Sequence, residues 1–290
     1  MKSLCVCLLL LPLLAFGARA DTLNTADSFA VLAGSTVTNA GVGVLGATVV
    51  NGSLGVSPGS TCSGFGTCPT TGPGTVINGT VHLADGVALQ AQSDLTTAFT
   101  TLQALGLGGS LVPGGVLSGT YAPGVYFAPA ASLTGKIFLN DGGVAGSQFI
   151  FYTPSTLITA PDSAIDVSGL SPSDGLFWVV GSSATLGDNT VFYGNILALT
   201  DINFDPGATI GCGRALARNG QVTFAGQNAT TGIENLVSIG CEGTTGEGGG
   251  GFNGSGGGPG PAPVPELSSL PLVATGLAAL VGSIRRKLLR

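Results

Sequence analysis

Residues able to carry acid–base or nucleophilic chemistry are few in this chain. The 290 residues include a single histidine, His82, and charged residues make up only 8% of the composition. Asp162, Asp188 and Asp205 recur near turns, but a polysaccharide-cleaving site needs clustered acids together with a basic residue. Aspartate is also an ordinary turn residue, because its side chain bonds its own backbone. The pattern therefore predicts a protein that is not an enzyme and needs no cofactor.

Charge and metal chemistry narrow the choice of partners. Between residues 21 and 262, three basic residues stand against 14 acidic ones. A surface that neutralises phosphates needs many Lys and Arg, so nucleic acid is not the expected partner. The acids offer oxygen ligands that would suit Ca²⁺. Their spacing does not require an ion, and we predict no metal site.

The N-terminal segment has the three parts of a secretory signal peptide. Lys2 supplies a positive charge, residues 8–16 an apolar run, and Ala18-Arg19-Ala20 a small-residue cleavage pattern. We therefore expect residues 1–20 to be removed and the mature chain to begin at Asp21, outside the cytoplasm.

Four cysteines remain after that cleavage: Cys62, Cys68, Cys212 and Cys241. An oxidising compartment favours disulfides, and four cysteines allow three sets of pairings. We expect Cys62–Cys68 and Cys212–Cys241, because each bond would close a local loop. The alternatives are free buried thiols and a zinc site, and the cysteine spacing matches no usual zinc finger.

The chain ends in a linker and a three-part tail. Residues 243–263 are rich in Gly and Pro, which is typical of a flexible linker. The apolar run 267–284 is at the lower length limit for spanning a bilayer, and the basic residues 285–287 should stay cytoplasmic. The tail 264–290 resembles the PEP-CTERM sorting signal of Gram-negative bacteria, which an exosortase-type enzyme cuts, with Pro265-Glu266-Leu267 in place of Pro-Glu-Pro. This resemblance implies a secreted or cell-surface protein that is transiently anchored in the inner membrane; the alternative is a plain C-terminal membrane anchor.

The middle of the chain alternates short apolar runs with turns. Residues 176–180, 191–198 and 210–217 are β-prone, and Gly187-Asp188-Asn189 and Asp205-Pro206-Gly207 lie between them. Short runs between Gly, Asn, Asp and Pro indicate strands rather than helices. The turn recurs after about 20 residues, a period typical of a solenoid whose coils bury their apolar faces on one another.

One segment has a different period. Residues 82–105 contain no Pro and one Gly, and their small and apolar residues are spaced by three and four, as on one face of a helix. We predict a helix from about residue 83 to 105, ended by Gly106 in a left-handed cap, with its apolar face packed on the strands. The predicted face consists of Ala84, Ala88, Ala91, Leu95, Ala98, Phe99, Leu102 and Leu105.

Three blocks of the middle segment resemble a known family. Residues 181–187 (GSSATLG), 194–200 (GNILALT) and 213–218 (GRALAR) are similar to core blocks of microbial ice-binding proteins of the DUF3494 type, in the same order. The resemblance implies a mainly β fold over residues 21–242: an irregular, three-sided, right-handed β-solenoid with the long helix packed along its side. It also implies an extracellular protein that adsorbs to ice through a flat solenoid face.

The resemblance extends to candidate ice-binding residues. Active members carry a Thr-Ala/Gly-x-Thr/Asn pattern, and five turns of this chain can be aligned with it, starting at Thr134, Thr159, Leu186, Asp205 and Ala225. Strands stacked in this way lie about 4.8 Å apart, so one position per coil makes a regular row. The resulting candidates are Thr134, Gly135, Thr159, Ala160, Asp162, Gly187, Asn189, Gly226 and Asn228.

Two functions are compatible with these features. Ice offers a lattice of oxygens and no charge, which a flat, rigid grid of small and hydroxyl side chains can match; Lys136 would disturb such a grid. The alternative is a surface adhesin or matrix protein of the same fold that binds exopolysaccharide. That function would favour exposed aromatic residues, and the chain has one Trp and four Tyr.

Overall fold

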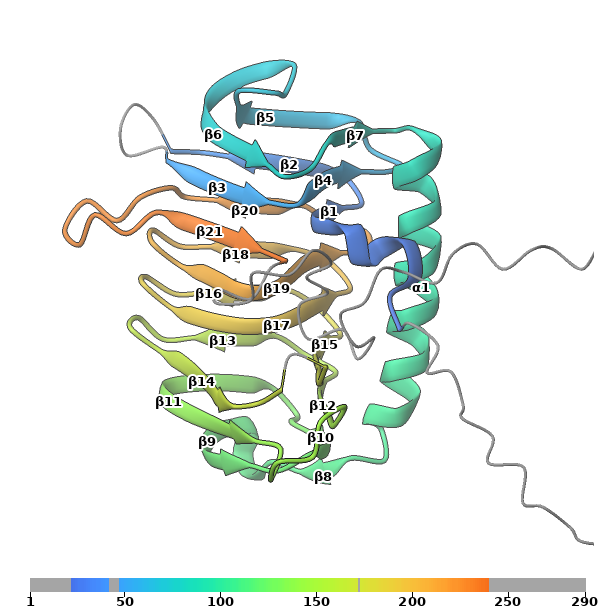
Figure 1. Cartoon of the computed structure of the whole chain (residues 1–290), viewed down its shortest axis with the longest axis vertical. Helices are drawn as coiled ribbons and strands as arrows, with labels where there is room; N and C mark the ends of the chain where they lie inside the picture. Colours follow the sequence, from blue (N-terminus) through green and yellow to red (C-terminus); the bar gives the residue numbers. More distant parts are fainter. Residues whose placement is uncertain (1–21, 42–46, 172, 240–290) are drawn as a thin grey trace, which may run out of the picture. The chain divides into compact units, whose positions relative to one another are not determined.

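The computed structural model describes residues 22–41, 47–171 and 173–239. They form a stack of short strands with one long helix along its side (Figure 1). The strand pairs in these residues are all parallel, and the strands fall into three columns, so that each coil of chain contributes to three sides. The predicted three-sided β-solenoid with one helix is confirmed.

Each side is a stack of parallel strands with its own order along the solenoid. Side A, which faces the helix, contains in stacking order β8 (Ser110–Leu111), β10 (Gly124–Phe127), β12 (Gln148–Thr153), β15 (Gly175–Val180), the ends of β17 (Val191–Ala198) and β19 (Thr209–Ala217), β1 (Phe29–Ala33), β4 (Ser53–Val56) and β7 (Val81–Leu83). Side B contains the starts of β9 (Val116–Tyr121) and β11 (Ala131–Asn140), then β13 (Leu157–Thr159), β16 (Ala184–Leu186), β18 (Ile202–Phe204), β20 (Val222–Phe224), β2 (Thr36–Asn39), β5 (Thr61–Phe65) and the start of β6 (Thr70–Ile77). Side C contains the ends of β9 and β11, then β14 (Ala164–Gly169), the starts of β17 and β19, β21 (Asn235–Ser238), β3 (Thr48–Asn51) and the end of β6.

The order of the coils in space differs from their order in the sequence. β1 lies between β19 and β4, so the first coil of the chain stacks on the last one. From there the chain builds one end of the stack, and α1 (Gly86–Gly106) then runs along side A to the other end (Figure 1). The later coils return from that end until they meet β1. Short 3-10 helices, η1 (Asn24–Ser28) and η3 (Pro113–Gly115), precede β1 and β9.

The helix confirms the predicted element and corrects its ends. It begins three residues later than predicted, because Ala84 is in the left-handed region (φ 50°) and the Asp85 side chain caps the helix by accepting a hydrogen bond from the Ala88 amide at 2.9 Å. Gly106 is the last helical residue and not a left-handed cap. A Cβ there would lie 2.2 Å from that of Tyr152, so glycine is required for close packing on β12.

The buried face of α1 differs from the predicted one at several positions. Ala84, which was predicted on this face, lies before the helix and is exposed, and Gly106 belongs to the buried face. Leu105 is 51% exposed, whereas Gln92 is buried and donates a hydrogen bond from Nε2 to the Ala217 carbonyl at 3.1 Å. Leu95, Phe99 and Leu102 pack, as predicted, with the outward apolar residues of side A. Those partners are Ile150, Phe177, Val179, Leu197 and Leu216.

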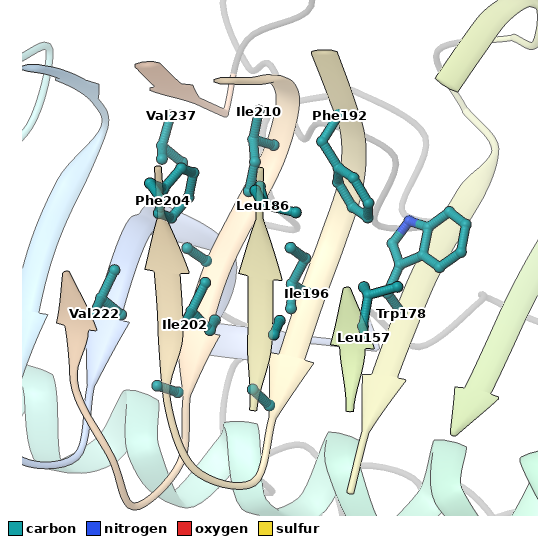
Figure 2. Packing of buried hydrophobic residues seen from close by; sticks show 14 of the residues in the cluster. Leu157, Trp178, Leu186, Phe192, Ile196, Ile202, Phe204, Ile210, Val222 and Val237 are labelled. Carbon is teal, nitrogen blue, oxygen red and sulfur yellow. The ribbon is translucent and has the colours of Figure 1, made fainter. Parts of the chain in front are cut away.

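Inside the stack, apolar residues of successive coils lie on one another. Figure 2 shows this interior, in which Leu157, Leu186, Ile202 and Val222 come from successive coils of side B and Phe192 and Ile210 from side C. The Trp178 ring stacks on Phe151 with centroids 4.2 Å apart. This packed interior holds the strands of side B at a fixed spacing.

The cysteines agree with the predicted pairing as far as the described residues reach. Cys62 and Cys68 are bonded to each other, and both are buried. Cys212 is also in a disulfide, but Cys241 lies outside the described residues, so the Cys212–Cys241 pair stays a prediction. The predicted signal peptide, linker and tail lie outside them too. Within the described part of the chain, no helix is long and apolar enough to cross a membrane.

Candidate functional site

The three sides of the solenoid differ in what they offer to a ligand. Side A is covered by α1. Side C carries the Lys136–Asp166 ion pair at 3.2 Å and the exposed ring of Phe138, and the register between its strands β11 and β14 shifts between Phe138 and Asn140. Side B is built from short strands, most of them in regular register, and is therefore the flattest candidate surface.

A row of polar side chains follows the middle of side B. In β16, β18 and β20 the burial pattern is buried, half-exposed, buried, so the middle residue of each strand points outward. Those residues pair in register from Thr185 to Asn203 to Thr223, and the row continues through Thr38 to Ser63. We call Thr185, Asn203, Thr223, Thr38 and Ser63 the hydroxyl–amide row. Neighbouring members are spaced as the strands are, about 4.8 Å apart.

A second line of hydroxyls accompanies part of this row. Thr36 and Thr61 pair in register, each two residues before a member of the row. Residues two apart on a strand are about 6.7 Å apart and point the same way. β2 and β5 therefore present four hydroxyls in a two-by-two array, and the Ser63 Oγ lies 3.5 Å from the Thr38 Oγ1.

The packed interior of the solenoid supports the strands that carry the hydroxyl–amide row. The residues on either side of Thr185, Asn203 and Thr223, the first three members of the row, are at most 1% exposed. They are Ala184, Leu186, Ile202, Phe204, Val222 and Phe224. Large, fully buried side chains leave little room for the strands to shift, so the outward hydroxyls keep their spacing.

The polar character of side B ends toward the β9 end of the stack. Beyond Thr185 in that direction, the same outward position is held by Ile158, Ser132 and Val116. Ile158 and Val116 are both about half exposed. The polar array therefore covers the coils from β16 to β5.

Two carboxylates flank Asn203 in its own coil. The Asp201 Oδ1 accepts a hydrogen bond from the Gln221 amide at 2.9 Å and so joins two coils. Burial, and then the charge of Asp188, raise the pKa of Asp205. Among the described residues, no three His, Cys, Asp or Glu side chains gather closely enough to hold a metal ion. The chemistry that side B offers is thus that of hydroxyl and amide groups.

The predicted alignment of the turns is wrong by one residue in two places. Thr159 pairs with Leu133 and Leu186, not with Thr134, and Leu186 pairs with Phe204, not with Asp205. A shift of one residue on a strand moves a side chain to the opposite face. Thr159 accordingly points inward and is 2% exposed.

Thr159 therefore has a structural role that contradicts its prediction as an ice-facing residue. Its Oγ1 accepts a hydrogen bond from the Gly187 amide at 2.9 Å and lies 2.8 Å from the Thr190 Oγ1. Gly187, Gly226 and Asn228 are buried as well, so these predictions are also corrected. The Asn228 Oδ1 accepts hydrogen bonds from two amides of its own loop.

The remaining predicted residues are accessible and lie around the corner between sides B and C. Asp162 and Asn189 are left-handed turn residues with φ 59° and 54°, and the Asn189 Nδ2 donates to the Asp162 Oδ1 at 3.1 Å. Thr134 and Gly135 are exposed and Ala160 is half-exposed. Lys136 lies on side C, so it does not interrupt side B.

The hydroxyl–amide row was not among the predicted site residues, although the sequence contains a signal for it. Each of its first three members stands between two apolar residues, in Ala184-Thr185-Leu186, Ile202-Asn203-Phe204 and Val222-Thr223-Phe224. This apolar–polar–apolar alternation is typical of a strand with one face in the core. Thr38 and Ser63 could not be added from the pattern alone, because their strands come from the other end of the sequence.

Comparisons with known proteins agree on one family. The sequence model of the family described as Ice-binding-like matches residues 31–230. An ice-binding protein of Nostoc sp. (strain HG1) is 45% identical over 215 residues, which cover 71% of this chain and 72% of that protein.

Solved structures show the same fold. The crystal structure of an ice-binding protein from an Antarctic biological consortium is 37% identical, with a TM-score of 0.62 over 74% of this chain and 90% of that one. That of an ice-binding protein from the Antarctic ascomycete Antarctomyces psychrotrophicus is 33% identical, with a TM-score of 0.63 over 75% of this chain and 97% of that one.

Proposed function

Because this chain belongs to the Ice-binding-like family, we propose that it binds ice crystals and that side B is the surface that adsorbs to them. The observation that carries the choice of side B is the hydroxyl–amide row, which runs in register through five coils. No covalent chemistry is needed for adsorption, and we infer that the protein is not an enzyme.

Side B has the physical properties that an ice surface requires. Ice offers hydrogen-bonding oxygens at fixed spacings and no net charge. A protein surface that matches it needs polar groups whose positions do not fluctuate, since ordering flexible side chains on binding costs free energy. The short strands of side B present Thr, Ser and Asn, which are small, over a fully packed interior.

The exopolysaccharide alternative has weaker support on this surface. Saccharide rings pack well on exposed aromatic side chains, but the hydroxyl–amide row and the two hydroxyls beside it contain none. If the purified protein left growing ice crystals round, adhesion to exopolysaccharide would become the better explanation.

Thr223→Tyr tests the assignment of side B. Thr223 is in the middle of the row, and a tyrosine ring there would prevent neighbouring residues from contacting a flat crystal. We expect thermal hysteresis and crystal faceting to be largely lost, with a change in stability of less than about 0.5 kcal/mol, as for most surface substitutions.

The matched control is Thr75→Tyr, at an exposed threonine on side C. It should keep the parent's hysteresis, and circular dichroism should show both variants folded. Loss of activity in the control alone would move the ice-binding surface to side C. Equal hysteresis in both variants and the parent would exclude Thr223 and Thr75 from the ice-binding surface.

We further propose that the protein is exported, and that its tail is a PEP-CTERM-like signal that an exosortase-type enzyme removes after transient insertion in the inner membrane. This proposal rests on the residue pattern of residues 1–20 and 264–290. The intact mass of the mature protein tests both cleavages.

A further inference from the structure

One end of the stack carries two strands that continue side B beyond the hydroxyl–amide row. They are β5 and β6, and we call them, with the turn between them, the β5–β6 cap (residues 61–77); it lies at the upper end of the stack in Figure 1. β6 pairs with β5 on side B and with β3 on side C, and within the described residues no further strand stacks beyond it. β6 is therefore an edge strand with a neighbour on one side only.

The outward hydroxyl positions of side B extend into this cap. Ser63, the last member of the hydroxyl–amide row, pairs in register with Thr70, the first residue of β6. Thr70 is exposed. Residues that pair on neighbouring strands point to the same face of the sheet, so Thr70 places a further hydroxyl about 4.8 Å beyond Ser63.

The composition of the cap suits a surface that lies against ice. Residues 57–81 contain no Asp, Glu, Lys, Arg or His. Burying a charge without a partner is costly, and ice has no charge to supply one. The exposed hydroxyl groups of the cap belong to Thr61, Thr67, Thr70, Thr71 and Thr75.

A disulfide joins the two parts of the cap from the core side. Cys62 directly precedes Ser63 and is bonded to Cys68, which lies two residues before Thr70. Both cysteines are buried and belong to the hydrophobic interior of the solenoid. The bond therefore ties the inward face of β5 to the segment that leads into β6.

Polar and backbone contacts hold β5 in place on the coil below it. The Asn39 Nδ2 donates to the Gly64 carbonyl at 3.0 Å, and the Asn39 Oδ1 accepts from the Thr48 hydroxyl at 3.0 Å. Gly64 has φ 82°, and a Cβ there would lie 2.1 Å from the Asn39 carbonyl oxygen, so the two backbones are in close contact. β5 is thus fixed by β2, and the disulfide passes that fixed position on to Thr70.

We propose that the β5–β6 cap is the end of the ice-binding surface, with Thr70 as its outermost contact residue, and that the Cys62–Cys68 disulfide positions Ser63 and Thr70 for the crystal. This inference rests on the proposed function of side B. Ordering flexible groups on binding costs free energy, and the edge strand β6 is where that cost would be largest. The disulfide removes the cost by ordering the cap before it meets ice.

Thr70→Tyr and Thr75→Tyr test the contact residue within one strand. Both threonines are exposed, but Thr75 pairs with Val49 on side C. We expect Thr70→Tyr to lose thermal hysteresis and Thr75→Tyr to keep the parent's value. Hysteresis at the parent's level in Thr70→Tyr, together with its loss in Thr223→Tyr, would overturn this inference and leave the proposed function standing. A parent without hysteresis would overturn both.

The double variant Cys62→Ala/Cys68→Ala tests the disulfide. Short loops gain least from a disulfide, and this bond joins residues six positions apart, so circular dichroism should show the remaining coils folded at the assay temperature. We expect hysteresis to fall. Hydrogen exchange of the Gly66 amide, which donates to the Gly74 carbonyl at 2.9 Å, should become faster, whereas the Ile202 amide, which donates to the Gln221 carbonyl at 2.9 Å, should keep its protection.

Adding Thr70→Tyr to the cysteine variant separates positioning from stability. Two changes that act on one contact are not additive, so the tyrosine should remove less hysteresis from the cysteine variant than from the parent. Equal losses in both backgrounds, or full hysteresis in the cysteine variant, would contradict the positioning role. Global unfolding of the cysteine variant would contradict it as well, because the disulfide would then stabilise the whole solenoid and not the cap.

Discussion

At the scale of single residues, Asp205 is the side chain of side B least suited to ice. It follows Phe204 directly, so it lies on the outward side at the end of β18, and burial and the charge of Asp188 raise its pKa. The ionised form is thus disfavoured in the folded protein. Stability should fall as pH rises from about 3.9, the unfolded value, through the raised pKa.

Asp205→Asn should remove this effect. We expect its melting temperature to exceed the parent's at neutral pH, by an amount equivalent to less than about 1 kcal/mol because the group is partly exposed, and the difference to vanish in acid. If side B binds ice, hysteresis should also increase, because a hydrated charge is lost. Thermal unfolding at several pH values measures the first effect, and hysteresis the second.

Asp166→Asn is the control with the opposite sign. Hydrogen bonds from Ser168, and then Lys136, lower the pKa of Asp166 to about 2. Its contribution is present above about 3.9 and lost as pH falls toward that lowered value, so the asparagine variant should be less stable than the parent at neutral pH. A stability change of the same sign in both variants would contradict the assigned shifts.

At the scale of elements, α1 is held against side A by the packing of one buried face. Leu95 is 0% exposed and packs against side A. Leu95→Asp would bury a charge without a partner, and we expect a loss of about 3–5 kcal/mol or failure to fold. Thermal melting followed by circular dichroism is the measurement.

Leu89→Asp is the matched control on the same helix. Leu89 is 61% exposed, and an acidic residue near a helix N-terminus is favourable, so the change should be under about 0.5 kcal/mol. Equal melting temperatures for the two variants would mean that the buried face is assigned wrongly. Gln92 would be a poor control, since it is buried and bonded to the Ala217 carbonyl.

At the scale of the whole molecule, the two ends of the described chain meet in the middle of the stack. β1 pairs with β19, β2 with β20 and β21 with β3. The buried Arg214 strengthens this junction, because its Nε donates to the Asp27 carbonyl at 2.7 Å and its Nη1 donates to the Asn195 Oδ1 at 2.9 Å. The continuity of the hydroxyl–amide row from Thr223 to Thr38 therefore depends on both ends folding together.

Export belongs to this scale too, because it decides which chain folds and in which compartment. We expect the mature protein to begin at Asp21 and to lack the apolar run 267–284, and we expect non-reducing peptide mapping to join Cys212 to Cys241. Each disulfide should stabilise the fold by about 2–4 kcal/mol. Mass spectrometry that finds residues 1–20 on the bulk of the protein, or a free thiol at Cys212, would contradict the predicted export and disulfide pairing.

The kinds of element and the local bonds could be predicted from the sequence. Apolar runs between turn residues indicated the strands of the solenoid, a period of three to four indicated α1, and six residues of separation brought Cys62 and Cys68 together. These properties depend on neighbours in the chain.

The register of the strands and the order of the coils, in contrast, depend on contacts between residues that are remote in the sequence. A strand side chain changes face with a shift of one residue. The predicted alignment of the turns was wrong by one residue at Thr134 and Asp205, so it predicted that Thr159 faces solvent, whereas the side chain points into the core. The hydroxyl–amide row on side B combines Thr185, Asn203 and Thr223 with Thr38 and Ser63. These two groups come from opposite ends of the sequence and meet because β2 pairs with β20. Pairing between such remote strands is set by burial of their shared interior, which no local pattern in the sequence encodes.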